Sequence, residues 1–277
     1  MLRRFLQCDV FSAVPTKGNG LAVVVDAKGM TTAQMQDFAA WTNLAETTFL
    51  LPPTMPDADY AVRIFTPGRE MPFAGHPTLG SCAAWLHSGG QPQEPGLVRQ
   101  ECQIGLVEID ISGDVPAFVA PPTQVSALPS SDQLRLTKAL GLDASQIVRS
   151  AQLNNGPVWQ VLELTDAATV LAIDADRVRW PEFVGLGVVG PHSTGAAADY
   201  EVRNLAPSSG MSEDPITGSL NAAIAQWMHA EGRLDRALVM AQGTVLGREG
   251  RVFVDSTPRG VTIGGHVHVL IDGTVDL

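Results

Sequence analysis

The alternation of hydrophobic and polar positions along the chain predicts many strands and few helices. The segment from Thr31 to Gln34 matches a capping box at the start of a helix, and 131–140 predicts a second short helix that Gly141 closes. Because the helices do not alternate regularly with the strands, the pattern indicates the α+β class. Strands are predicted at 5–10, 21–25, 44–51, 60–65, 104–111, 158–164, 183–189, 200–205, 251–254 and 267–271.

The chain contains an internal repeat at about half its length. Two arginines, Arg63 and Arg203, stand 140 residues apart, and each lies four residues before a proline at a predicted strand end. An acidic residue follows in each copy, and then a Pro-x-x-Gly motif. Such a period predicts two lobes of related fold, and we expect each arginine to form an ion pair at its strand end. The matched segments are 63–67, Glu70 and 77–80 in one copy, and 203–207, Glu213 and 215–218 in the other.

Each copy continues into a segment without charged residues, 77–86 in the first and 215–228 in the second. Proline suits the first position of a helix, so the sequence predicts that both helices begin at that residue. A helix that is small or apolar on every side must be buried on every side. We therefore expect two pseudo-symmetric lobes, 1–115 and 125–263, each a curved mixed sheet wrapped around a buried central helix.

The starts of the two central helices are the predicted place for chemistry. The unpaired N–H groups and partial positive charge of a helix start bind carboxylates. We expect the two starts, Gly75–Thr78 and Glu213–Ser219, to face each other across a cleft. His76 and Asp214 would take the N-cap position before the helical proline. Plain capping is the alternative for Asp214, because aspartate is a favoured N-cap residue.

Glu46 is the third candidate for chemistry. Strand alternation places Glu46 on one face with Leu44, Thr48 and Leu50. A carboxylate that shares a face with leucines is expected to be partly buried, which is a suitable setting for a general acid or base. The alternative is an edge strand on which Glu46 faces water.

Composition and charge exclude several classes of protein. Of 277 residues, 45% are hydrophobic and 17% are charged, which is enough apolar material for a core. The net charge is −11 without a basic cluster, so no nucleic acid partner is expected. No apolar run reaches the roughly 18 residues of a membrane span, and no signal peptide is predicted. Three cysteines, Cys8, Cys82 and Cys102, lack metal-ligand spacing and favour the reducing cytoplasm.

Two motifs suggest other chemistry but lack the context for it. Gly185–Gly190 matches Gly-x-Gly-x-x-Gly, on which a dehydrogenase hypothesis depends, but Pro191 and no helix pattern follow. His266 and His268 share one strand face without an evident third metal ligand. We therefore expect no cofactor and no metal.

The order of several motifs resembles the PhzF-like family, which is related to the isomerase of phenazine biosynthesis. The resemblance covers nearly the whole chain and implies the diaminopimelate-epimerase-like fold, with a tail at about 264–277 that returns to the first lobe. It also implies a homodimer. The motifs are Asp9-Val-Phe, Gly18-Asn19, Leu44-Ala-Glu-Thr-Thr-Phe49, Arg63-Ile-Phe-Thr-Pro67, Met71-Pro-Phe-Ala-Gly-His-Pro-Thr-Leu-Gly80, Glu213-Asp-Pro-Ile-Thr-Gly-Ser219, Gln242-Gly243 and Gly247-Arg248.

The resemblance implies a cofactor-independent isomerase that moves a proton on a small cyclic or unsaturated carboxylate, as in trans-2,3-dihydro-3-hydroxyanthranilate isomerase. The proton-shuttling glutamate of that family corresponds to Glu46. Its conserved histidine, aspartate and serine correspond to His76, Asp214 and Ser219. The backbone N–H groups of Gly75 and Gly218 would help to hold the substrate carboxylate. Thr78, at the first helix start, is also expected to bind the substrate.

Departures from the family pattern leave the substrate open. Asn204-Leu205 stands where an aromatic pair is common, and Glu249-Gly250 where Pro-Ser is common. One alternative is a non-catalytic protein that binds a small carboxylate or a partner on the same scaffold. A weaker alternative is an epimerase or racemase. Such enzymes of this fold use one cysteine at each helix start, and here the segments 75–76 and 213–214, which contain no cysteine, occupy those positions.

Overall fold

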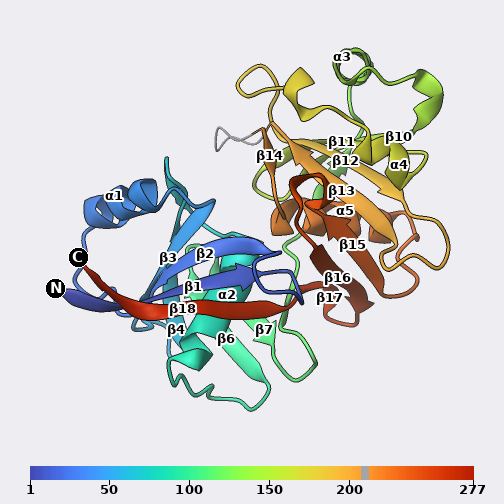
Figure 1. The fold of residues 1–277 in the computed structure, drawn as a ribbon. Coiled ribbons are helices and arrows are strands. Elements are labelled where there is room, and N and C mark those ends of the chain that lie inside the picture. The colour runs from blue at the N-terminus through green and yellow to red at the C-terminus, as the bar shows by residue number, and fades with distance from the viewer. Residues whose placement is uncertain (207–211) are drawn as a thin grey trace. The chain divides into compact units, whose positions relative to one another are not determined.

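The computed structural model describes residues 1–206 and 212–277, so Pro207 of the second arginine-to-proline motif lies outside the described residues. The fold is α+β, and the chain divides into two compact units (Figure 1). The first unit consists of Met1–Val119 together with Gly264–Leu277, and the second is Ala120–Ile263. The C-terminal segment thus completes the unit that the N-terminal segment begins.

The first unit is a mixed sheet in which the strand order differs from the chain order. Across the sheet, adjacent strands follow the order β18, β1, β2, β3, β4, β6, β7 and β8. The pairs β2–β3 and β4–β6 are parallel. The strands are β1 (Leu2–Val10), β2 (Asn19–Val24), β3 (Glu46–Leu51), β4 (Tyr60–Phe65), β5 (Glu70–Met71), β6 (Leu97–Cys102), β7 (Gly105–Asp110), β8 (Ala117–Val119) and β18 (Val267–Asp276).

The second unit repeats this pairing scheme. Its neighbours run β9, β10, β11, β12, β13, β15 and β16, with parallel pairing between β11 and β12 and between β13 and β15. In each unit a two-residue strand, β5 or β14, pairs with the end of the preceding long strand. The strands are β9 (Gln124–Ser126), β10 (Ile147–Asn154), β11 (Val158–Leu164), β12 (Leu186–Pro191), β13 (Tyr200–Leu205), β14 (Glu213–Asp214), β15 (Leu238–Gln242), β16 (Gly250–Thr257) and β17 (Gly260–Gly264).

Helices α1 (Thr32–Thr42) and α2 (Gly75–His87) pack on opposite faces of the first sheet. The predicted capping box of α1 is confirmed, since Thr31 and Gln34 bond each other's backbone N–H groups. Phe49 of β3 belongs to the apolar cluster under α1. Thr48, the next residue toward the start of β3, accepts a 2.9 Å hydrogen bond from Ser81 of α2. Alternate residues of β3 therefore face different helices.

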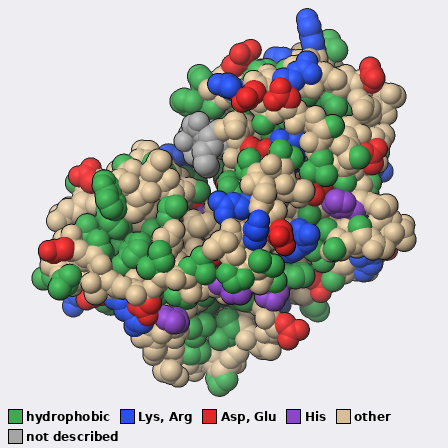
Figure 2. Space-filling model, in the orientation of Figure 1, with side chains coloured by type: hydrophobic (Ala, Val, Ile, Leu, Met, Phe, Trp, Pro, Cys, Tyr) green, Lys and Arg blue, Asp and Glu red, His purple; other side chains and the backbone are tan. Residues whose placement is uncertain are grey.

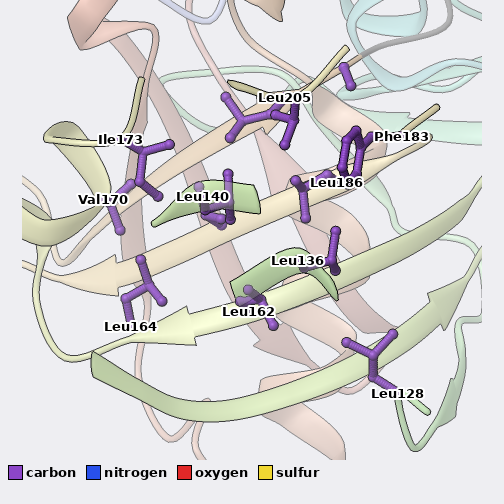
Figure 3. Packing of buried hydrophobic residues seen from close by; sticks show 13 residues of the cluster. Leu128, Leu136, Leu140, Leu162, Leu164, Val170, Ile173, Phe183, Leu186 and Leu205 are labelled. Carbon is purple, nitrogen blue, oxygen red and sulfur yellow. The ribbon is translucent and has the colours of Figure 1, made fainter. Parts of the chain in front are cut away.

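In the second unit, α3 (Ser130–Leu140) and α4 (Ala167–Leu171) cover one face of the sheet, and α5 (Gly218–Ala230) lies on the other. The predicted closure of α3 by Gly141 is confirmed, because this residue takes the left-handed conformation with φ 71°. Figure 3 shows the apolar cluster between α3, α4 and strands β11 to β13. Its members include Leu136, Leu140, Leu162, Leu164, Val170, Ile173, Leu186 and Leu205.

The Gly-x-Gly-x-x-Gly motif has a packing role in this unit. Its last residues lie inside β12 and the next strand or helix is β13, so the motif does not join a strand to a helix. A Cβ on Gly187 would lie 2.7 Å from Leu220 of α5, and a Cβ on Gly190 would lie 2.6 Å from the carbonyl oxygen of Asp166. The glycines thus allow close approach on both sides of the sheet.

Strands β6 and β15 are among those that the hydrophobic pattern did not predict. Each carries a polar residue at a fully buried position, Gln100 in β6 and Gln242 in β15. Both amides are hydrogen-bonded inside the fold, which is how a polar group becomes tolerable there.

Among the described residues, none of the helices is long and apolar enough to cross a membrane. On the face in Figure 2, basic and acidic side chains are interspersed.

Candidate functional site

The first group of candidate residues is a direct contact between Glu46 and His76. Glu46 is the first residue of β3, and His76 is the second residue of α2. Nδ1 of His76 lies 3.1 Å from Oε2 of Glu46, and the two side chains are 4% and 20% exposed. The structure therefore brings together two of the three residues predicted to be catalytic.

The fold explains why these two side chains meet. Thr48 faces α2, and strand alternation gives Glu46 the same orientation. Because β3 pairs with β2 on one side and β4 on the other, it is not an edge strand, and that alternative for Glu46 is wrong.

The start of α2 offers unused hydrogen-bonding groups beside this pair. Nε2 of His76 is buried and has no partner among the described residues. The N–H groups of Gly75 and His76 also find no acceptor there, as the first turn of a helix allows. Thr78 supports the helix start from inside, since its hydroxyl donates to the carbonyl oxygen of Ala74 and accepts from Gln100.

The second group lies at the start of α5. Asp214 is the last residue of β14, while Gly218 and Ser219 are the first two residues of α5. The carboxylate of Asp214 accepts a short hydrogen bond from the hydroxyl of Thr217. The N–H groups of Gly218 and Ser219 bond to no acceptor within the described part of the chain.

The predicted N-cap positions are wrong. Ala74 and Thr217 are the N-cap residues, and neither helix begins at its proline. Asp214 cannot enter the helix, because sheet pairing with Asn204 holds it in the extended conformation. His76 lies inside the first turn, where its side chain can reach β3.

The helix starts also correct the register of the internal repeat. The helices begin at Gly75 and Gly218, which are 143 residues apart, whereas the Pro-x-x-Gly motifs are separated by 138. Ser219 is therefore the counterpart of His76. The Pro-x-x-Gly motif identified both helices but not equivalent positions within them.

An ion pair anchors the strand that leads to each helix, as the sequence predicts. Arg63 lies 2.6 Å from Glu70 of β5, and Arg203 lies 2.6 Å from Glu213 of β14. The Arg63 hydrogen bond lowers the pKa of Glu70. Both side chains of the second pair are only 1% exposed, so β14 is held from inside the core.

None of the three cysteines lies at a helix start. Cys8 is in β1, Cys82 is in the interior of α2 and Cys102 ends β6. Burial raises the pKa of Cys8 and of Cys82 to about 12. A mechanism that uses one thiol at each helix start therefore has no suitable thiol here.

Cys8 and Cys82 should resist iodoacetamide in the folded protein at about pH 8, because only a thiolate reacts readily. Peptide mass spectrometry before and after unfolding in guanidinium chloride measures this. We expect both residues to be unmodified in the folded protein and fully modified after unfolding. Rapid modification of either cysteine in the folded state would contradict the burial described here.

The two histidines near the C-terminus are engaged with the chain itself. Nε2 of His268 lies 3.1 Å from the carbonyl oxygen of Ala13, and His266 also has an interaction partner. Within residues 1–206 and 212–277, no group of three His, Cys, Asp or Glu side chains is arranged to hold a metal ion.

Sequence reasoning missed a buried polar network around Thr217. The side chains of Asn204, Asn221 and Gln242 bond to Thr217 or to one another in the second unit. One signal was present in the sequence, because Gln242-Gly243 belongs to the motif set. The hydrophobic periodicity of the sequence predicts no role for Gln242.

Comparisons with known proteins support one family. The family model described as phenazine biosynthesis-like protein (PhzC-PhzF) matches residues 8–273. Antisense-enhancing sequence 1 of Schizosaccharomyces pombe is 33% identical over 290 residues, covering 97% of each protein. Trans-2,3-dihydro-3-hydroxyanthranilate isomerase of Pseudomonas aeruginosa is 30% identical over 258 residues, covering 91% of this chain and 90% of that protein.

The fold is likewise similar to solved structures. The crystal structure of the Bacillus anthracis phenazine biosynthesis protein of the PhzF family matches with a TM-score of 0.84. Its identity is 21%, and the match covers 100% of both chains.

Proposed function

Because the chain belongs to the phenazine biosynthesis-like (PhzC-PhzF) family, we propose that it is an isomerase that moves a proton within a small cyclic or unsaturated carboxylate. The observation that carries the proposal is the contact between Glu46 and His76, with the second ring nitrogen of His76 buried and unpartnered. Isomerase is also the enzyme class named for the Pseudomonas aeruginosa relative.

In this mechanism Glu46 takes a proton from one substrate carbon and returns it to another, so no group is lost and no redox change occurs. An ionised carboxylate only accepts hydrogen bonds, so Nδ1 of His76 carries the hydrogen in their contact. Nε2 is then an acceptor in the neutral imidazole and a donor in the protonated one. It is thus available to a polar group of the substrate.

The remaining candidates would bind and steer the substrate. N–H groups at a helix start are suited to a carboxylate, and those of Gly75 and Gly218 have this role in the proposal. The Ser219 hydroxyl assists them, and Asp214 directs where the proton returns. No metal or cofactor takes part in these steps.

The test is proton NMR in D₂O with trans-2,3-dihydro-3-hydroxyanthranilate. We expect the signal of the carbon-bound ring proton that is moved to disappear when the protein is added and to persist in buffer alone. Loss of this signal at the same rate without protein would remove the proposal for this substrate. Binding without exchange, seen as line broadening, would instead favour the non-catalytic alternative.

The non-catalytic alternative has one observation in its favour. The Schizosaccharomyces pombe relative, at 33% identity, has a name that refers to antisense enhancement and not to a reaction. On this alternative the same helix starts bind a small carboxylate or a partner without proton transfer.

A homodimer in the cytoplasm completes the proposal. The dimer is implied by the family resemblance, and the location by three cysteines without disulfide partners. Light scattering coupled to size-exclusion chromatography measures the assembly directly.

A further inference from the structure

We propose that Gln242 is a positioning residue that holds Asp214 and the start of α5 in a fixed relation. The kinetic part of this inference rests on the proposed function, but its structural part does not. Gln242 is the last residue of β15 and is fully buried, so its amide must be satisfied inside the protein.

All the hydrogen-bonding capacity of this amide is directed at the segment around Asp214. Oε1 of Gln242 accepts the backbone N–H of Thr217 at 2.9 Å and the side-chain N–H of Asn221 at 2.7 Å. Nε2 donates to the carbonyl oxygen of Asp214 at 3.2 Å and to Oγ1 of Thr217 at 3.1 Å. One side chain thus connects β14, the N-cap and the first turn of α5.

These bonds determine the direction of the Thr217 hydroxyl. A hydroxyl has one hydrogen and two acceptor positions. Gln242 and Asn204 donate to Oγ1 of Thr217, at 3.1 and 2.9 Å, and so occupy both acceptor positions. The single hydrogen is left for the carboxylate of Asp214, to which Thr217 donates. Gln242 therefore sets the orientation of this carboxylate through Thr217.

The same arrangement decides which N–H groups remain for a ligand. Gln242 accepts the hydrogen bond of the Thr217 N–H. In the described residues, the N–H groups of Gly218 and Ser219 are therefore the first at the start of α5 that have no acceptor. A carboxylate that approaches α5 would meet these two groups in a fixed position.

We call the four hydrogen bonds of the Gln242 amide the Gln242 clamp. The first unit has no glutamine at the corresponding position, although Gln100, two residues earlier in its strand, donates to Thr78 of α2. In the parallel pairs, Tyr60 lies opposite Gln100 and Tyr200 lies opposite Met240. The position that corresponds to Gln242 is therefore Cys102, whose sulfur bonds to the Gly105 carbonyl oxygen of its own hairpin. Helices α2 and α5 both lack a side-chain cap, so the difference between the units lies in the hydrogen bonds from Gln242 to the carbonyl oxygen of Asp214 and to Thr217.

The structural part is tested by amide hydrogen exchange without substrate. Gln242→Leu should raise the exchange rate of the Thr217 N–H at least about tenfold, because its acceptor is removed. The matched control is Gln100→Leu, which removes the other buried glutamine of an equivalent strand and should leave Thr217 unchanged. If Gln242→Leu stays within about threefold of wild type at Thr217, the inference is wrong whether or not the protein turns over a substrate.

The kinetic part uses trans-2,3-dihydro-3-hydroxyanthranilate. Misplacement of a catalytic group by about 1 Å can lower a rate about 100-fold, so Gln242→Leu should lower kcat about 10- to 100-fold with a smaller change in KM. Gln242→Glu keeps the two hydrogen bonds that Oε1 accepts but loses the two that Nε2 donates, so it should lower kcat even though the N–H of Thr217 keeps its acceptor. Leu136→Ala, a destabilising change under α3, should lower the unfolding midpoint but not kcat.

The outcomes separate the two proposals. An equal kcat for Gln242→Leu and wild type would overturn the positioning role. Absence of turnover by wild type together with faster Thr217 exchange in Gln242→Leu would remove the proposed substrate but support the clamp.

Discussion

Replacing Glu46 with glutamine should lower turnover of trans-2,3-dihydro-3-hydroxyanthranilate by about 10²–10⁴-fold, the usual effect of losing one positioned acid or base. Glutamine has nearly the same volume and can still contact Nδ1 of His76, which lies 3.1 Å from the Glu46 carboxylate. It cannot take up a proton from carbon. The loss should therefore appear in kcat, while the unfolding midpoint stays near that of wild type.

A matched control isolates the position from the chemical change. Glu108→Gln makes the same substitution on β7, where Glu108 is exposed, and should leave turnover unchanged. His76→Asn in the Glu46→Gln background should add little further loss, because residues that act as a unit are not additive. Unchanged turnover in Glu46→Gln would exclude this carboxylate as the proton carrier.

Replacing Glu213 with alanine should lower the free energy of unfolding by about 3–5 kcal/mol, because a buried arginine is left without its counter-charge. Arg203 donates to both carboxylate oxygens of Glu213, at 3.0 and 2.6 Å. It also donates to the carbonyl oxygens of Val170 and Ile173, so it cannot swing out to water easily. Urea unfolding of wild type and variant, followed by circular dichroism, measures the difference.

The equivalent pair of the first unit is the internal control. Arg63 and Glu70 are 27% and 21% exposed, so Glu70→Ala should change stability by only about 0–1 kcal/mol. Since the pKa of Glu70 is lowered in the folded protein, its contribution is present above the ordinary value of 4.5. This contribution disappears as the pH falls through the lowered pKa. Equal losses from Glu70→Ala and Glu213→Ala would contradict the difference in burial.

The sequence predicted the features that depend on near neighbours along the chain. The predicted strands at 60–65, 158–164 and 200–205 have the observed bounds, and the Thr31 capping box is present. The alternation around Glu46 gave the face on which it meets α2. In each of these cases the signal lies in residues two to four positions apart, which is the spacing that periodicity detects.

The register of the central helices was beyond such reasoning. The Pro-x-x-Gly match suggested that Pro77 and Pro215 begin the helices, but pairing between β13 and β14 keeps Asp214 extended and delays α5 until Gly218. The clamp by Gln242 was also missed, because it joins residues separated by up to 28 positions. Only the folded sheet brings these residues together.

The return of β18 to the first unit has a consequence for the order in which the protein is made. β1 pairs with β18 along its whole length, from Leu2 opposite Asp276 to Val10 opposite Val267. The first unit therefore lacks this strand until Gly264–Leu277 has been synthesised, after the whole of Ala120–Ile263. Ala120–Ile263 is continuous in the chain, so it can complete its own contacts earlier. Until β18 is made, the edge of β1 with which it pairs is an unpaired sheet edge in the nascent first unit.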